Sequence, residues 1–387
     1  ARPDIRKANQ PLGLAAIFAA SNFPYAFSVI GGDSASAIAA GCPIIVKSHP
    51  SHPNTCRMMR DAVVEGFKNA GFSEDSFVMA EGLNPEITHW IAAHPSVTSI
   101  GFTGSGMVGK LLTDISHKRE VPIPVYAEMG SLNPVFFTPG ALKANAEALA
   151  KAAMDSATLG SGQFCTKPGI LVIPNGAEGD EFLKNLESYL ATLAVAPLLN
   201  KGIADRYSSA TAKLAIDSKL KVFKGKETEG GFGVEPTVFV VDWEVAKSNH
   251  ELLEEHFGPT SVIIRTDFAN FEKVAEEMEG QLCAALHTVA GEKVSRLLNI
   301  LADRAGRVIM NGFPTAVAVT AAMQHGGQWP SSSTHTTSVG LDSIYRFLRP
   351  VAHQNYLDEL LPPSLQNSNP WNISRLVNGE LTNKAIG

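Results

Sequence analysis

The chain has 387 residues, of which 44% are hydrophobic and 18% are charged, so it can bury the cores of two or three domains. Its formal net charge is -6 and its sequence contains no basic block, which argues against a nucleic-acid partner. No apolar run reaches the roughly 18 to 20 residues that cross a bilayer, so we expect no membrane partner.

Apolar strands and small-residue helices alternate through the first third of the sequence. This alternation predicts a doubly wound, parallel α/β sheet with helices on both faces. Ligands bind at the carboxyl ends of the strands in such sheets, and Asn22, Lys47 and Ser105 each follow a predicted strand closely. Strands are predicted at residues 10–20, 43–47, 76–80 and 97–102, and helices at residues 27–40, 52–70 and 85–93.

Residues 103–109 contain a GxGxxG pattern between a predicted strand and a predicted helix. A helix that begins there presents free N–H groups to a pyrophosphate, so Gly104, Ser105 and Gly109 are candidate cofactor-binding residues. Ser105 could instead only cap its helix. Glu128 lies about 20 residues further on, where a dinucleotide fingerprint places its ribose ligand. Because Glu128 ends a predicted strand and enters a turn, we assign it a different role below.

The second half of the chain continues the alternation and predicts a further α/β domain. The tail from Leu348 carries several prolines and is expected to be an extended arm that lies across another surface. Helices are predicted at residues 141–159, 180–193, 271–279 and 292–305, and strands at residues 170–173, 238–241, 261–265 and 307–311. We predict three units: residues 1–130, 131–338 and 339–387.

One cysteine, Cys165, lies in the glycine-rich turn 160–166 between a predicted helix and a predicted strand. Backbone N–H groups of such a turn can lower the pKa of a thiol, and the thiolate is the nucleophilic form. A free cysteine is often simply a buried small hydrophobe, but the flanking glycines favour an exposed nucleophile. The other cysteines, Cys42, Cys56 and Cys283, lack CxxC spacing, so we expect reduced thiols in a cytoplasmic protein.

A metal site is not expected from the sequence. His250 and His256 flank several glutamates, but they are six residues apart rather than four and therefore fall on different faces of a helix. His335 lies in a polar loop, where a solvated histidine is the simplest interpretation.

Several separated motifs occur in the order typical of the aldehyde dehydrogenase superfamily, which the chain resembles over nearly its whole length. Further motifs resemble those of 2,5-dioxovalerate (α-ketoglutarate semialdehyde) dehydrogenases. The superfamily motifs are SNFP at 21–24, FTGS at 102–105, EMG at 128–130, FC at 164–165 and EHFGP at 255–259; the others are VKSHP at 46–50, GQFCT at 162–166, NGFPT at 311–315 and HGG at 325–327, with the tail from RPV at 349–351 to LPP at 361–363.

The resemblance implies the aldehyde dehydrogenase fold, NAD(P)-dependent chemistry and three catalytic residues. Cys165 would attack the aldehyde carbon, and the Asn22 amide and the Cys165 backbone N–H would stabilise the oxyanion. Glu128 would activate water to hydrolyse the thioester, with a pKa that burial can raise. Asn22 could alternatively cap a helix.

The resemblance also implies cofactor-binding residues. Lys47 would hold the adenine-side ribose, Ser105 the pyrophosphate and Glu255 the nicotinamide ribose, with Phe257 near the nicotinamide ring. Lys47 could instead be a solvated surface lysine, Glu255 an exposed acid on a helix and Phe257 a phenylalanine of the core. Many NAD-preferring members carry a glutamate three residues after the lysine; here that position is Pro50, so we expect NADP to be preferred over NAD.

The resemblance thus predicts a cofactor-binding domain at 1–130, a catalytic domain at 131–338 and an arm at 339–387 that returns to the cofactor domain or an assembly interface. The expected reaction converts α-ketoglutarate semialdehyde to 2-oxoglutarate. The alternatives are another aliphatic or fatty aldehyde, or a truncated, non-catalytic nucleotide-binding protein. We also expect a homo-oligomer, a dimer or tetramer, and an N-terminal segment that is missing relative to the family. Lys167 and Arg57 are candidate cations for a substrate carboxylate.

Overall fold

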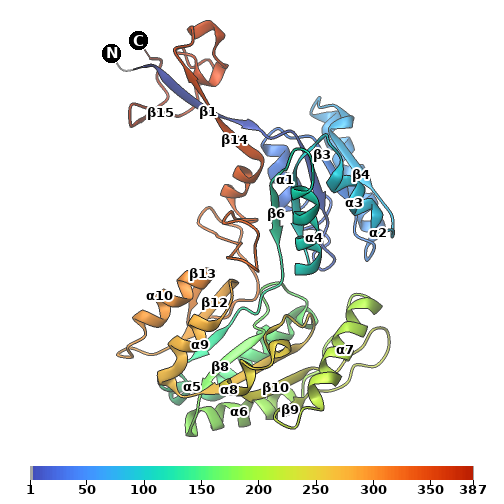
Figure 1. The fold of residues 1–387 in the computed structure, drawn as a ribbon, viewed down its shortest axis with the longest axis vertical. Helices are drawn as coiled ribbons and strands as arrows, with labels where there is room; N and C mark the ends of the chain where they lie inside the picture. The colour runs from blue at the N-terminus through green and yellow to red at the C-terminus, as the bar shows by residue number, and fades with distance from the viewer. Residues whose placement is uncertain (1–2, 387) are drawn as a thin grey trace.

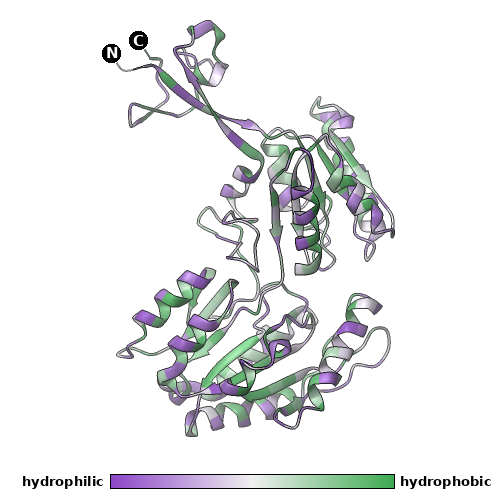
Figure 2. Ribbon diagram, in the orientation of Figure 1, coloured by the Kyte–Doolittle hydropathy of each residue, from purple (hydrophilic) through white to green (hydrophobic). Residues whose placement is uncertain are grey.

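The computed structural model describes residues 3–386 as an elongated molecule with two α/β bodies and a projecting ribbon (Figure 1). Apolar residues concentrate on the strands and on the inner faces of the helices (Figure 2). Within the described residues, no helix is both long enough and apolar enough to cross a membrane.

The upper body contains a five-stranded, all-parallel sheet, which confirms the doubly wound arrangement. Its order is β4-β3-β2-β5-β6, so the chain reverses its direction of winding between β2 and β5. That switch point is where open α/β sheets bind ligands. The strands are β2 (Leu14–Phe18), β3 (Ile44–Lys47), β4 (Phe77–Ala80), β5 (Val97–Thr103) and β6 (Val125–Glu128).

Helices cover both faces of this sheet because its strands are apolar on both sides. α1 (Gly32–Ala39) and α2 (Pro53–Asn69) pack against a cluster that includes Ile17 and Val46. α3 (Glu86–Ala93) and α4 (Gly106–His117) pack against an opposite cluster that includes Ile100.

The lower body contains a seven-stranded sheet, β13-β12-β7-β8-β11-β10-β9, in which only β9 and β10 pair antiparallel. One face carries α5 and α6, and the other carries α8, α9 and α10. The elements are β7 (Val135–Phe137), α5 (Pro139–Thr158), β8 (Ile170–Pro174), α6 (Ala177–Leu190), α7 (Lys201–Ala215), β9 (Lys221–Lys224), β10 (Thr237–Asp242), α8 (Trp243–Ala246), β11 (Thr260–Thr266), α9 (Phe271–Glu277), β12 (Gln281–His287), α10 (Ser295–Arg304) and β13 (Ala305–Met310).

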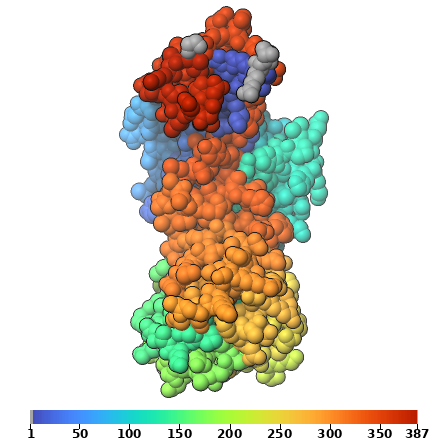
Figure 3. Space-filling model, turned by 90° about the vertical axis from the view of Figure 1, so that its left-hand side faces the viewer, coloured from blue at the N-terminus to red at the C-terminus, as the bar shows by residue number. Residues whose placement is uncertain are grey.

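A two-stranded antiparallel ribbon of β1 (Ile5–Pro11) and β14 (Leu348–Gln354) projects from the upper body. The C-terminal part of the chain runs along one face of the molecule and lies beside the N-terminal strand at its far end (Figure 3). A small hairpin of β15 (Arg375–Val377) and β16 (Glu380–Thr382) follows.

Some predicted elements were wrong in their extent. The single strand predicted at residues 10–20 is split, because Gly13 adopts a φ of +117° that ends β1 and redirects the chain into β2. The helix predicted at 27–40 begins only at Gly32, after turns. The strands β7, β9 and β12 and the helix α7 were not predicted at all; β7 has only 3 residues, too few for a periodic signal.

A buried ion pair fastens the segment before the ribbon to the upper body. This segment, a 3₁₀ helix at Leu341–Phe347, lies on α1, where the Ser343 and Ser36 hydroxyls are 2.7 Å apart. Arg346 pairs with the Asp33 carboxylate and donates a hydrogen bond of 2.7 Å to the carbonyl of Tyr126. Burial raises the pKa of Asp33, and the guanidinium charge opposes that rise.

We predict that Arg346→Met lowers the free energy of unfolding by about 3–5 kcal/mol, because it leaves the Asp33 carboxylate buried without its partner. Urea denaturation followed by near-ultraviolet circular dichroism measures the change. The matched control is Arg296→Met, which removes an exposed arginine that pairs with Glu272 and Glu276 and should cost about 1 kcal/mol or less. Equal losses in the two variants would contradict the prediction.

Candidate active site

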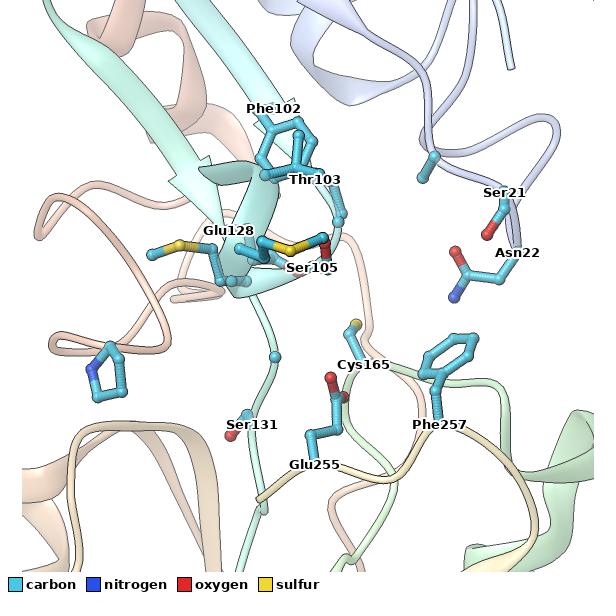
Figure 4. A pocket seen from close by; sticks show the side chains of 18 of the residues that line it. Ser21, Asn22, Phe102, Thr103, Ser105, Glu128, Ser131, Cys165, Glu255 and Phe257 are labelled. Carbon is cyan, nitrogen blue, oxygen red and sulfur yellow. The ribbon is translucent and has the colours of Figure 1, made fainter. Parts of the chain in front are cut away.

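A cavity of about 1260 Å³ lies between the two bodies and gathers most of the residues singled out by the sequence. Its upper wall comes from the ends of β2, β3, β5 and β6, and its lower wall from the cysteine turn and the segment around residues 250–257 (Figure 4). The candidate residues that line it are Asn22, Lys47, Gly104, Ser105, Glu128, Cys165, Glu255 and Phe257.

Gly109 is the candidate residue that does not line the cavity. It lies inside α4, where a Cβ atom would be only 2.5 Å from the sulfur of Met129. The absence of a side chain at this position therefore lets the helix approach the end of β6 closely, which is a packing role rather than a contact with a ligand.

The cysteine turn needs its glycines for two reasons. Residues 160, 161 and 162 all have left-handed backbones, with φ values of +57°, +56° and +68°. A Cβ on Gly162 would also lie 2.1 Å from the carbonyl oxygen of Gly258. The turn thus brings Cys165 against the segment that carries Glu255 and Phe257, and the Asn133 amide holds it by donating to the Cys165 carbonyl at 2.8 Å.

Three side chains from distant segments converge at the back of the cavity. The Cys165 sulfur is 3.7 Å from Nε2 of His325, and the same nitrogen is 2.9 Å from Oε1 of Glu128. The Cys165 sulfur, a ring nitrogen of His325 and a carboxylate oxygen of Glu128 all lie within 4.8 Å of one another. Glu128 and His325 are almost fully buried, at 3% and 1% exposure, so water does not screen their interaction.

The sequence analysis placed His325 in a motif but gave it no role. It is separated from Cys165 by 160 residues, so no local spacing connects the two. The only local signal is the pair of glycines that follows it: Gly326 has a φ of +149° and packs against the carbonyl of Thr336.

The pKa values at this cluster are shifted in opposite directions. Burial and the nearby Glu128 carboxylate hold the pKa of the Cys165 thiol well above its usual value. The expectation that burial raises the pKa of Glu128 is wrong in its net effect. Burial does favour the neutral acid, but His325, the Ser338 hydroxyl and Arg346 outweigh it and lower the pKa. The carboxylate is therefore ionised near neutral pH.

Asn22 and Cys165 both line the cavity and each has an N–H hydrogen that donates to no acceptor among residues 3–386. The Asn22 side chain donates one hydrogen bond, of 2.8 Å, to the Gln163 carbonyl, which leaves its second amide hydrogen available. The Cys165 N–H donates no hydrogen bond to any of residues 3–386. Asn22 does not act as a helix cap, because α1 begins ten residues later, at Gly32.

Lys167 has a structural role, so it is not available as a cation for a substrate. Its buried ammonium donates to the carbonyls of His256, Gly258 and Thr260 at 2.8, 3.1 and 2.8 Å. Burial lowers the pKa of Lys167 and raises that of Glu255, and the opposite charges of the two groups limit both shifts. Arg57 pairs with Glu81 at an exposed site and is not among the residues that line the cavity.

The upper wall fits a dinucleotide. Ser105 occupies the N-cap position of α4, but its hydroxyl makes no capping hydrogen bond, so the first N–H groups of the helix remain available to a phosphate. Lys47 ends β3 at the same rim, half-buried, with its pKa lowered by burial. Across the cavity, the Glu255 carboxylate lies so close to Gly130 that a Cβ there would be 2.3 Å from Oε2.

Comparison with known proteins gives consistent matches. Residues 4–350 match the model described as "Aldehyde dehydrogenase family". The chain is 41% identical to alpha-ketoglutaric semialdehyde dehydrogenase 2 of Azospirillum brasilense and 39% identical to alpha-ketoglutaric semialdehyde dehydrogenase of Acinetobacter baylyi. Each of these matches covers 98% of this chain and 73% of the relative.

Solved structures share the fold. A Thermus 1-pyrroline-5-carboxylate dehydrogenase with bound NAD has a TM-score of 0.77 at 23% identity, over 92% of this chain and 68% of that one. Proline utilization A of Bdellovibrio bacteriovorus also has a TM-score of 0.77, at 22% identity over 91% of this chain, but the chain spans only 36% of that protein. These likenesses confirm the predicted fold.

We predict that Glu128→Gln lowers the pKa of Cys165, because it removes a negative charge beside the thiol. The rate at which iodoacetamide alkylates Cys165 should then rise at lower pH than in the unchanged protein. Peptide mass spectrometry across a pH series measures the shift. Glu254→Gln, which neutralises an exposed acid on the cavity rim, should leave the profile unchanged. A profile that does not move in Glu128→Gln would contradict the prediction.

Proposed function

The chain belongs to the aldehyde dehydrogenase family, and on this premise we propose that it oxidises α-ketoglutarate semialdehyde to 2-oxoglutarate with NADP or NAD. The substrate is supported by the names of the two relatives at 41% and 39% identity. The observation that supports the chemistry most directly is the cluster of Cys165, His325 and Glu128, in which Cys165 and Glu128 line the cavity.

Cys165 is proposed as the nucleophile. Its raised pKa keeps the thiol protonated at rest, so the proton must leave as the sulfur attacks the aldehyde carbon. Nε2 of His325 lies within reach of that proton, at 3.7 Å from the sulfur. The Glu128 carboxylate, 2.9 Å from the same nitrogen, would stabilise the imidazolium that forms. A positioned base of this kind contributes about 10²–10⁴-fold to a rate.

The oxyanion of the thiohemiacetal requires donors that are in place before the charge develops. The Cys165 N–H and the second amide hydrogen of Asn22 are proposed for this role. The hydrogen bond from Asn22 to the Gln163 carbonyl fixes the amide plane, so little reorganisation is needed.

A nicotinamide cofactor, when bound, supplies the hydride acceptor for the oxidation. Lys47 and the N-terminus of α4 would hold its adenine-side ribose and phosphates, while Glu255 and Phe257 would bound its nicotinamide end. The remaining step is hydrolysis of the thioester on Cys165. Glu128 is ionised and adjacent to the sulfur, so it is the proposed base for the attacking water.

We also propose a cytoplasmic homo-oligomer. All four cysteines are unpaired, which fits a reducing compartment. Large apolar side chains are exposed on the C-terminal part of the chain that accompanies the ribbon, and a second copy would cover them. They are Tyr356, Leu357, Leu360, Trp371, Leu376 and Leu381.

The catalytic proposal predicts separable kinetic defects on an aldehyde panel that includes α-ketoglutarate semialdehyde and a long-chain aldehyde. Cys165→Ala should lower kcat by a factor on the order of 10³ or more. His325→Gln should slow the first turnover. Glu128→Gln should retain a stoichiometric burst of reduced cofactor and then turn over slowly, because hydrolysis is impaired.

His335→Gln is the control, since this exposed histidine lies in the same loop as His325 but outside the cluster. Activity that survives in Cys165→Ala would overturn the chemistry. A higher kcat/KM for the long-chain aldehyde would overturn only the substrate.

We propose a preference for NADP because Pro50, three residues after Lys47, offers no carboxylate to repel a 2′-phosphate. Pro50→Glu should raise the ratio of kcat/KM with NAD to that with NADP by about tenfold, through like-charge repulsion. Pro50→Gln introduces a side chain of the same shape as glutamate but without its charge, so it should change the ratio far less. Identical ratios in the Glu and Gln variants would refute the proposal.

A further inference from the structure

We propose that Cys165, His325 and Glu128 form a binding site for Zn²⁺, which would hold the nucleophile in an inactive, protected state. The inference uses the same three side chains as the proposed function, but it requires neither aldehyde nor nucleotide. Nothing in the sequence suggests such a site, because its ligands come from three separate segments of the chain.

The donor set is the first argument. Zn²⁺ binds cysteine sulfur, histidine nitrogen and carboxylate oxygen, usually four ligands in a tetrahedral arrangement. Bond lengths of about 2.0–2.3 Å place the ligand atoms of such a site roughly 3.3–3.6 Å apart. Here Nε2 of His325 lies 3.7 Å from the Cys165 sulfur and 2.9 Å from Glu128 Oε1, and all three atoms fall within 4.8 Å of one another. The separation of Nε2 and the sulfur is close to that of zinc ligands, whereas Nε2 and Oε1 would have to move apart as the ion binds.

The second argument is that the two oxygens of the Glu128 carboxylate face different partners. Oε2 accepts a hydrogen bond from the Ser338 hydroxyl, which fixes the carboxylate plane. Oε1 is buried and lies 2.9 Å from Nε2 of His325, so it is directed at the cluster. A buried carboxylate oxygen beside an imidazole and a thiol can serve as a ligand to a cation at this point.

The third observation is that hydrogen bonds hold the backbone that carries the three ligands, whereas Nδ1 of the His325 ring is buried without a partner among residues 3–386. The backbone N–H of His325 donates to the Thr337 hydroxyl at 2.9 Å, and the backbone carbonyl of His325 accepts from the Ser338 N–H at 2.7 Å. The Asn133 amide holds the carbonyl of Cys165. The backbone that carries Glu128 is held at the next residue, where the Met129 N–H donates to Ser331 at 2.8 Å.

Charge balance is the fourth argument. A thiolate, a carboxylate and a neutral imidazole carry two negative charges, which a divalent zinc ion neutralises. Zinc would displace the Cys165 proton into solvent as it binds, and the sulfur would share its nucleophilic lone pair with the metal. Cys165 and Glu128 line the cavity, so a zinc ion could enter from that side.

The test uses the metal alone. Zn²⁺ from a buffered solution should protect Cys165 of the whole chain from iodoacetamide, as measured by the mass of its peptide, and EDTA should restore alkylation. Co²⁺ should produce a thiolate-to-cobalt absorption band at one ion per chain. His335→Gln should behave like the unchanged protein, Cys165→Ala should lose the band, and His325→Gln should bind about tenfold more weakly or worse.

Two results would overturn the inference: Cys165 alkylated at the same rate with and without Zn²⁺, or equal protection in His325→Gln and the unchanged protein. If His325→Gln does not fold, Glu128→Gln takes its place with the same expected loss of affinity. Loss of catalysis in these variants would not bear on the zinc site, since protection and absorption are read without substrate.

Discussion

The buried ammonium of Lys167 is the constraint on which the geometry of the cavity depends. Its three hydrogen bonds end on the carbonyls of His256, Gly258 and Thr260, and these contacts also satisfy the buried ammonium, which would be costly to leave without partners. Lys167 is only two residues beyond Cys165, so the same contacts fix the distance between the nucleophile and the wall that carries Glu255 and Phe257. The left-handed turn at 160–162 completes this attachment, because Gly162 rests directly on the Gly258 carbonyl.

This arrangement makes the cavity electrostatically asymmetric. Near the sulfur it holds two carboxyl groups, Glu128 and Glu255, and the ammonium that could balance them is turned toward backbone carbonyls. The thiol is consequently protonated at rest. The donors proposed for the developing negative charge are the Cys165 N–H and the Asn22 amide. Such a site favours a transition state in which charge moves from sulfur to oxygen over a ground state with a free thiolate.

Sequence reasoning succeeded where the chain carries its information locally. The apolar runs that became β2, β3 and β5 predicted the parallel sheet, and the polar residues that follow them line the cavity at its carboxyl edge. It failed where partners are supplied by tertiary structure. His325 and Ser338 reach Glu128 from a loop without periodicity. Lys167 was a candidate cation for a substrate carboxylate, and only its carbonyl partners reveal its structural role. The net pKa of Glu128 depends on those distant partners, so composition and burial alone gave the wrong direction.

The cluster at Cys165 shows why a site suited to proton transfer is also suited to zinc. Both tasks require a sulfur, an imidazole nitrogen and a carboxylate oxygen with lone pairs that converge on one point in a poorly solvated space. A proton at that point can be shared in a hydrogen bond by only two of the three atoms at a time, and it moves between them. A dication can be bound by all three atoms at once and dissociates slowly. The burial that sharpens the acid–base pair therefore also raises the affinity for a cation, and the aldehyde and the metal would compete for the same sulfur lone pair.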